Sequence, residues 1–291
     1  MSRLTGKTGM ENWSILDCHL LWAIEAAPTA EQRKAPHMQN AFYPFYLHQG
    51  ETTITYRSSR ETHGPGQWVF PKMDEGKHRF SDDVRLLAVR FTAKWPSETS
   101  LFDRDQTVVF SGKESAGLTR TARRLVHFIE RHALLGYRRR GSPVLTGSLS
   151  DYIRLQPLFH GWMEAFYLAY NRAGYEPVRF GPVSERMRPC IRYLRHRMLS
   201  TPFYERELAE IAGISVSQIC KIFVQELGMT PQSYWNNRRL HTAKMELSNT
   251  DRSIKEIAFS LGFSSPEHFA RWFAKIVGIS PRGYRSQGNG G

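Results

Sequence analysis

The sequence predicts an α+β fold with a β-rich N-terminal half and an all-α C-terminal domain. Three observations support this prediction. Short stretches rich in aromatic and β-branched residues alternate with turn residues over roughly the first 111 positions. Apolar residues at helical spacing follow from Leu118 onward, and the stretch 208–284 contains one helical pattern twice. At 291 residues the chain is long enough for two domains with separate cores.

The expected N-terminal strands are short and closely spaced. Residues 52–56 alternate in the manner of a half-buried strand, and residues 84–91 form a continuous β-type run. Strands are predicted at 41–47, 52–56, 67–70, 84–91 and 107–110. Frequent turn signals between them favour a small β-barrel or a double-sheet roll.

Two amphipathic helices are predicted after the strands. Apolar residues recur at helical spacing from Leu118 to Ala133 and again from Leu155 to Tyr170. The arginine run 138–140 between the two helices is predicted to lie in an exposed, solvated loop, with a phosphate contact as the weaker alternative.

The helical pattern in residues 208–284 occurs twice, and the turn in the second copy is one residue longer. Gly213 and Gly262 supply the residue that tolerates a positive φ where the first helix of each copy ends. Ser215 and Gln218 are spaced as a capping box, and Ser265 precedes a proline at the first helical position. Each copy is therefore predicted to be a helix-turn-helix, with an ordinary helical bundle as the alternative.

The predicted helices have apolar stripes that should form the core of each copy. The first helices are expected to pack through Leu208, Ile211 and Ala212 in one copy and through Ile254, Ile257, Ala258 and Leu261 in the other. The second helices are expected to pack through Ile219, Ile222 and Phe223, and through Phe269, Trp272 and Phe273. Residues 232–247 are predicted to form a helix that connects the copies.

The charge of the chain points to a polyanionic partner. The net charge is +13, and from Ser184 onward there are 16 Lys and Arg against 9 Asp and Glu. DNA or RNA is the expected partner, and an anionic membrane surface is the alternative. Three separated cysteines indicate neither a disulfide framework nor a zinc site. These cysteines fit a reducing cytoplasm. No apolar run approaches the roughly 18 residues that span a bilayer, so we expect no membrane-spanning segment.

Residues 254–285 carry a long and specific motif. It reads Ile254-Lys255-Glu256-Ile257-Ala258, Leu261-Gly262-Phe263-Ser264-Ser265, His268-Phe269-Ala270-Arg271-Trp272-Phe273, Gly278-Ile279-Ser280-Pro281 and Tyr284-Arg285. This motif resembles the AraC/XylS family of bacterial transcription regulators. The sequence departs from the family at Pro266-Glu267, where members often carry small or amide side chains. The resemblance implies double-stranded DNA as a partner, with RNA polymerase as a further candidate.

A weaker resemblance concerns the N-terminal half. The segment 66–71, together with His78 and the run 86–91, looks like the cupin-type effector-binding barrel that many AraC-family regulators carry. The paired histidines and glutamate of enzymatic cupins are not visible, so no metal, cofactor or catalytic residue is predicted. The two amphipathic helices look like the family's dimerisation helices, which implies a homodimer; alternatively, they only cover the barrel.

Residues on the exposed side of each second helix should read base edges, because only they can reach the major groove. These candidates are Ser217, Gln218, Cys220 and Lys221 in the first copy and Glu267, His268, Ala270 and Arg271 in the second. Gln218 has an alternative role in its capping box, and Glu267 has one as a favourable charge at a helix N-terminus. Arg238, Arg239 and Arg282 are the predicted phosphate contacts.

The barrel should be a cup for a small molecule such as a sugar or a related metabolite. Aromatic rings stack on sugar faces, while His and Arg fix polar groups. The candidate lining residues are Tyr46, His48, Arg57, Trp68, His78 and Trp95. Ordinary core positions for the aromatic residues and surface positions for Arg57 and His78 are the alternatives.

Together these interpretations divide the chain into five segments. They are a cupin-like effector-binding barrel at 1–115, a helical dimerisation or cover segment at 116–172, a linker at 173–183, a double helix-turn-helix DNA-binding domain at 184–285 and a flexible tail at 286–291. The predicted function is a bacterial, ligand-controlled, sequence-specific transcription regulator without catalytic activity. A cupin enzyme with a DNA-binding tail and a ligand-independent DNA-binding protein are the alternatives.

Overall fold

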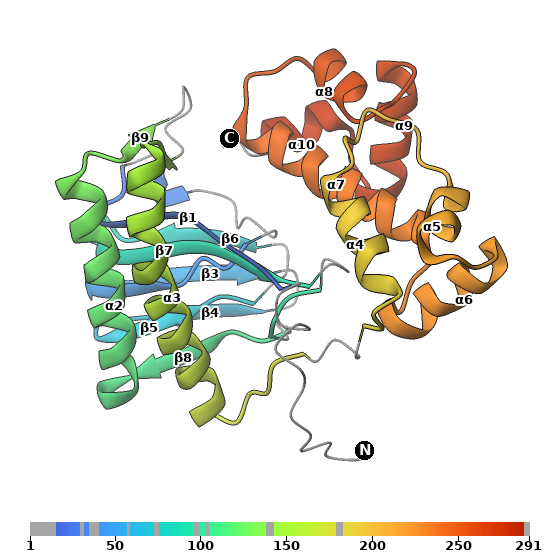
Figure 1. Cartoon of the computed structure of the whole chain (residues 1–291). Coiled ribbons are helices and arrows are strands. Elements are labelled where there is room, and N and C mark those ends of the chain that lie inside the picture. The colour runs from blue at the N-terminus through green and yellow to red at the C-terminus, as the bar shows by residue number, and fades with distance from the viewer. Residues whose placement is uncertain are drawn as a thin grey trace. The chain divides into compact units, whose positions relative to one another are not determined.

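The structure, a computed structural model, describes residues 16–29, 32–34, 41–56, 59–72, 76–95, 99–102, 105–137, 143–178 and 183–287. Contacts within the chain divide it into two compact units. The N-terminal unit is built mainly on Cys18–Ala93 and Phe102–Pro177, and the C-terminal unit on Val178–Tyr284 with Lys94–Leu101. The first unit contains the sheets and the second is helical, as the α+β prediction requires (Figure 1).

The N-terminal unit contains two larger sheets and one hairpin. The five-stranded sheet has the order β1 (Asp17–Ala26), β7 (Arg85–Lys94), β2 (Phe45–Gln49), β5 (Gln67–Phe70) and β8 (Val108–Ser111). The three-stranded sheet has the order β4 (Arg60–His63), β3 (Thr52–Tyr56) and β6 (Gly76–Phe80), and β9 (Leu135–Tyr137) pairs with β10 (Pro143–Leu145). The predicted strands at 52–56 and 67–70 are confirmed, whereas β1, β4 and β6 had not been predicted individually.

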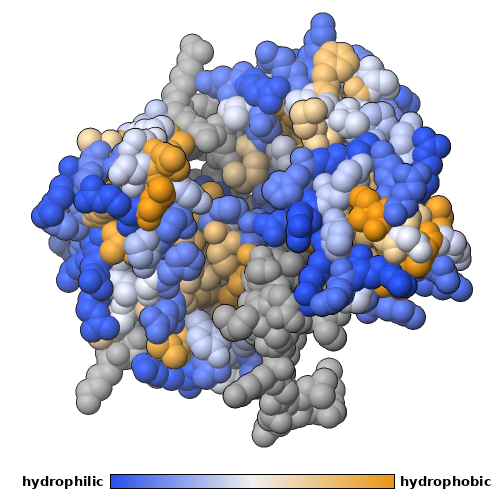
Figure 2. All heavy atoms as spheres, viewed as in Figure 1, coloured by the Kyte–Doolittle hydropathy of each residue, from blue (hydrophilic) through white to orange (hydrophobic). Residues whose placement is uncertain are grey.

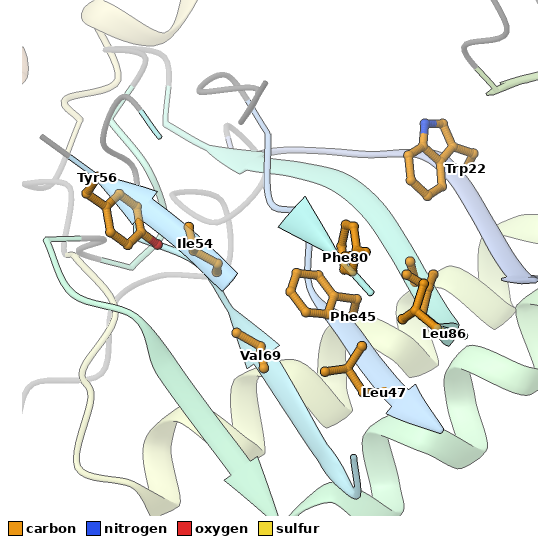
Figure 3. Packing of buried hydrophobic residues seen from close by; sticks show 10 residues of the cluster. Trp22, Phe45, Leu47, Ile54, Tyr56, Val69, Phe80 and Leu86 are labelled. Atoms are coloured by element: carbon orange, nitrogen blue, oxygen red, sulfur yellow. The ribbon is translucent and has the colours of Figure 1, made fainter. Parts of the chain in front are cut away.

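The two larger sheets enclose an apolar core (Figure 3). Phe45 and Leu47 on β2 and Ile54 on β3 are fully buried in it, and Phe80 on β6 is 6% exposed. The Phe45 and Phe80 rings meet edge to face with their centroids 5.4 Å apart. Alternation along each strand directs these residues to one side and their neighbours to the other.

Helices α2 (Gly112–Arg131) and α3 (Leu149–Arg172) cover the other face of the five-stranded sheet (Figure 1). Trp68 on β5 donates its indole N–H to the Thr119 hydroxyl on α2 at 3.0 Å. Its ring centroid lies 5.3 Å from that of Trp162 on α3. Full burial of an apolar side chain such as Phe166 stabilises the fold by about 1.5–3 kcal/mol. Both predicted amphipathic helices are therefore confirmed.

The C-terminal unit is an assembly of short helices. They are α4 (Met187–His196), α5 (Glu205–Ala212), α6 (Val216–Leu227), α7 (Pro231–Asn249), α8 (Ile254–Ser260), α9 (Pro266–Val277) and α10 (Pro281–Gln287). Helix α7 extends the connecting helix predicted at 232–247 by one residue at its start and two at its end. Ser286 and Gln287 belong to α10, although we had assigned them to the tail. The remainder of that tail and the arginine run 138–140 lie outside the described residues.

Candidate nucleic-acid interface

Helices α5 and α6 form the first helix-turn-helix, and its turn has the predicted chemistry. Gly213 ends α5 with a φ of 64°. The Ser215 hydroxyl accepts a hydrogen bond from the Gln218 backbone at 3.3 Å, and the Gln218 side chain accepts one from the Ser215 backbone at 3.1 Å. This capping box satisfies two backbone donors at the start of α6, which fixes where that helix begins.

Helices α8 and α9 repeat the arrangement with a longer turn. Gly262 has a φ of 77°, Pro266 is the first residue of α9, and the Ser265 hydroxyl accepts from the His268 backbone at 3.1 Å. A Cβ atom at Gly262 would lie 2.7 Å from the Leu199 carbonyl oxygen, so this turn also requires glycine for space.

The two copies have equivalent cores. Phe223 and Tyr234 meet edge to face with ring centroids 5.9 Å apart, and Phe273 and Tyr284 repeat the contact at 5.4 Å. The interplanar angles of the two pairs are 82° and 78°. One predicted core residue is wrong: Ile211 is exposed on α5, where the buried residues are Leu208 and Ala209.

Helix α7 belongs to both copies. Tyr234 near its start packs on the first copy, whereas Ala243 and Leu247 near its end lie in the core of the second. Its 19 residues span roughly 28 Å at the α-helical rise. A single continuous helix with one end in each core fixes the spacing of the two helix-turn-helix units.

Helices α6 and α9 each present a polar face. Ser217, Gln218 and Lys221 are exposed on α6. Glu267, His268 and Arg271 are exposed on α9, while the predicted base-reading residues Cys220 and Ala270 are half-buried. Six of the eight predicted base-reading side chains are therefore open to solvent on two equivalent helices.

The surroundings of two candidates favour structural roles. Burial and the neighbouring Glu205 carboxylate raise the pKa of the Cys220 thiol, so the thiol stays neutral. Glu205 is the first residue of α5, so the thiol contacts that helix. The first-turn backbone N–H and the Ser265 hydroxyl lower the pKa of Glu267, as expected for a carboxylate at a helix N-terminus. The Glu267 carboxylate is therefore ionised. In this form it can still accept a hydrogen bond from the amino group of cytosine.

Two exposed residues on these faces were not predicted. Gln225 follows Lys221 by four residues on α6, and Lys275 follows Arg271 by four on α9. Residues four apart lie one above the other on a helix. This spacing was available in the sequence and would have extended each predicted reading face by one turn.

Two of the three predicted phosphate contacts are engaged inside the C-terminal unit. Arg238 donates to the backbone carbonyls of Leu194, Arg195 and Arg197, which are at the C-terminal end of α4. The side chain thus satisfies carbonyls that the helix leaves without partners.

The Arg239 guanidinium lies over the rings of Trp235 and Phe263, 5.8 and 5.1 Å from their centroids. Burial lowers the pKa of Arg239, consistent with a packed position between α7 and the second helix-turn-helix. The third predicted phosphate contact, Arg282, is exposed in the first turn of α10 (Pro281–Gln287).

The predicted effector residues do not lie on one face of one sheet. Tyr46, His48 and Trp68 face the helix layer. His48 Nε2 lies 2.7 Å from Glu25, which also pairs with Arg123 on α2. These three residues therefore do not line the space between the two sheets.

His78 lies on the inner side of the three-stranded sheet and is 3% exposed. Its ring centroid lies 6.2 Å from that of Tyr43, and burial raises the pKa of Tyr43 to about 12, with Arg90 acting in the opposite direction. Tyr43 and Arg90 were not predicted, although Arg90 is a charged residue inside the apolar run 86–91 and could have been noticed there.

The two remaining effector candidates lie elsewhere. Trp95 is buried and donates its indole N–H to the Val178 carbonyl at 2.7 Å, within the C-terminal unit. Arg57 lies outside the described residues.

The described part of the chain holds no group of three or more His, Cys, Asp or Glu side chains suited to a metal ion. None of its helices has the length and apolar character needed to cross a membrane.

Two helix-turn-helix units on one connecting helix define a DNA-binding domain of the helix-turn-helix class. Residues 208–287 match the protein-family model described as "Helix-turn-helix domain". This C-terminal segment is of the AraC type, so the family resemblance is confirmed for it.

Two curated relatives and one solved structure each match about a third of this chain. The chain is 42% identical over 81 residues to the HTH-type transcriptional regulator YdiP of Escherichia coli K12, covering 28% of this chain and 27% of YdiP. It is 36% identical over 93 residues to the HTH-type transcriptional regulator ArgR of Pseudomonas aeruginosa, covering 32% and 28%. An AraC-type transcriptional regulator structure from Chromobacterium violaceum is 29% identical, with 35% and 91% coverage and a TM-score of 0.33. The matched region thus spans little more than a quarter of these two curated relatives.

Proposed function

We propose that the protein is a sequence-specific DNA-binding transcription regulator that acts in the bacterial cytoplasm. The observation that carries this proposal is the pair of helix-turn-helix units with equivalent caps and cores, held by α7. The match to a helix-turn-helix domain and the names of the relatives support it. Helices α6 and α9 would enter successive segments of the major groove, which lie about 34 Å apart.

Base contacts are proposed for the exposed residues of the two helices. Lys221 and Arg271 have the long cationic side chains that pair with guanine, and His268 adds a further donor or acceptor. Arg282 is a proposed phosphate contact, because it is exposed in the first turn of α10, whereas Arg238 and Arg239 are partly buried.

Selection of bound sequences from a random DNA pool tests this proposal with the full chain. The expected site has two half-elements separated by about one helical turn of DNA. A Lys221→Ala/Arg271→Ala variant should enrich no such site, while a matched Arg120→Ala/Arg124→Ala variant on α2 should enrich the same site as the unmodified chain. Failure of the unmodified chain to enrich any sequence would contradict the proposal.

We also propose that a small molecule controls the regulator from a cupin-like N-terminal unit. The supporting residues are Tyr43, His78 and Arg90, polar groups at the inner faces of the two sheets, where Arg90 is 8% exposed. Hydroxyl and imidazole groups among aromatic rings suit a sugar or a related metabolite. Ligand binding would shift the protein between DNA-engaging arrangements through a difference in affinity.

A thermal-unfolding screen with a panel of sugars tests the effector proposal. A sugar that binds should raise the unfolding temperature of the unmodified chain. Tyr43→Phe keeps the ring packing and removes only the hydroxyl, so it should reduce that increase. No response to any sugar would contradict the effector class and would leave the DNA-binding proposal standing.

A homodimer is proposed through α3. Leu149 is 74% exposed and Ile153 60% exposed at the start of this helix, where Figure 2 shows a hydrophobic patch. Exposed apolar side chains on one helix face are typical of an association surface. Sedimentation of the full chain would show a dimer that Ile153→Asp weakens; a monomer at all concentrations would contradict this.

A further inference from the structure

The outer face of the three-stranded sheet is positively charged. Thr53 and Thr55 on β3 point away from the core, because the residues that alternate with them are buried. The strand register places Arg60 on β4 and Lys77 on β6 opposite Thr55, and Arg79 on β6 opposite Thr53. Arg60, Lys77 and Arg79 therefore share one face, and all three are exposed.

These three cations have no acidic partner within the described part of the chain. Neighbouring strands are about 4.8 Å apart and alternate residues about 6.7 Å apart, so the positive charges stand close together. Arg60 on β4 and the two cations on β6 are separated by β3, whose outward residues Thr53 and Thr55 carry no charge. An anion bound between the cations would offset their mutual repulsion and accept charge-assisted hydrogen bonds from both guanidinium groups.

A hollow adjoins this face. Its volume is about 450 Å³, which is in the range of small-molecule sites. The lining residues are Arg33, Glu51, Thr53, Arg60, Arg79, Phe80, Ser81 and Asp82. The hollow thus offers two unpaired guanidinium groups and two hydroxyl groups to an occupant.

The residues that line the hollow are not all positively charged. Asp82 pairs with Arg33 at 3.5 Å, and Glu51 lies two residues before Thr53 on the outward side of the chain. A nucleic-acid strand carries a phosphate at every nucleotide and would meet these carboxylates. A small molecule with its negative charge at one end avoids them.

We propose that this face binds a small molecule through a doubly charged anionic group, such as a phosphate monoester, held by Arg60, Lys77 and Arg79. The site is separate from the DNA-binding helices and from the space between the sheets. It would give the protein a second ligand, recognised by charge.

Titration of the full chain with inorganic phosphate, followed by NMR of the backbone amides at constant ionic strength, tests this proposal. The amide signals of 53–55 and 77–79 should shift in a saturable way. In Arg60→Ala/Arg79→Ala the apparent affinity at these amides should fall at least about tenfold, since two charge-assisted contacts are lost. Arg120→Ala/Arg124→Ala removes the same charge from exposed positions on α2 and should bind like the unmodified chain.

Three results would overturn the proposal. One is an absence of shifts at 53–55 and 77–79 in the unmodified chain, and another is their persistence in Arg60→Ala/Arg79→Ala. The third is an equal loss in both double variants, which would indicate a general effect of net charge. If the first double variant misfolds, the single replacement Arg79→Gln provides the same comparison and should still weaken phosphate binding.

Discussion

The Gln218 side-chain oxygen accepts a hydrogen bond from the Ser215 backbone N–H at 3.1 Å, at the first turn of α6. A residue predicted to read bases is thus also part of the cap that starts the reading helix. Gln218→Ala should lower the free energy of unfolding by about 1 kcal/mol, because one N-terminal donor loses its acceptor. Gln218→Glu keeps an acceptor at this position and should be as stable as the unmodified chain. Equal stability of all three proteins in urea would contradict a capping role.

The two turn glycines should differ in their tolerance of a side chain. Both have a positive φ, but a Cβ at Gly262 would lie 2.7 Å from the Leu199 carbonyl, whereas the space around Gly213 is open. Gly213→Ala should cost roughly 1 kcal/mol of unfolding free energy, from backbone strain alone. Gly262→Ala should cost more, because Leu199 must also move. Denaturant unfolding of both variants measures the difference, and an equal cost would contradict the close approach at Gly262.

Two of the three predicted phosphate contacts, Arg239 and Arg282, should respond differently to replacement by alanine. Arg239→Ala should destabilise the fold by about 1 kcal/mol through loss of its stacking on Trp235 and Phe263. Arg282→Ala should reduce the salt dependence of DNA binding by about one unit of slope, an effect not expected of Arg239→Ala. Thermal unfolding and binding isotherms at several salt concentrations measure the two effects. Reversed outcomes for the two variants would contradict the assignment.

Stability should depend on His241 under acid conditions. Burial on α7 lowers the pKa of His241 from 6.5 to about 4. Between these values the unfolded chain binds a proton that the folded chain does not, so stability falls as pH is lowered from about 6.5 towards 4. His241→Gln should flatten this part of the profile, whereas His196→Gln, at an exposed position on α4, should not. Unfolding free energies measured across this pH range would decide, and an unchanged slope in His241→Gln would contradict the effect.

Much of the C-terminal unit was predictable because its signals are local. The cap at Ser215 and the turn at Gly213 depend on residues within a few positions of each other. In contrast, the role of an arginine that the sequence predicts to be exposed depends on partners far away in the chain. Arg238 finds its acceptors at the end of α4, more than 40 residues earlier in the chain, and no local pattern indicates this.

The residues of the proposed effector site were harder to predict, because both faces of the five-stranded sheet are buried. Along β2, Phe45 and Leu47 face the other sheet, while Tyr46 and His48 face the helix layer. When both faces are covered, the sequence has no polar alternation to distinguish them. The choice between Tyr46 and Tyr43 as an inward residue therefore required the strand pairing.

The central claim is that each helix-turn-helix unit reads its own DNA segment. The most direct test compares the base preferences of Lys221→Ala and Arg271→Ala with those of the full unmodified chain, by selection from a random DNA pool. We predict that each variant relaxes one position, at a cost of about 1–3 kcal/mol, and that the two positions lie in different half-elements about one helical turn apart. Relaxation within the same half-element, or unchanged preferences in both variants, would contradict the claim.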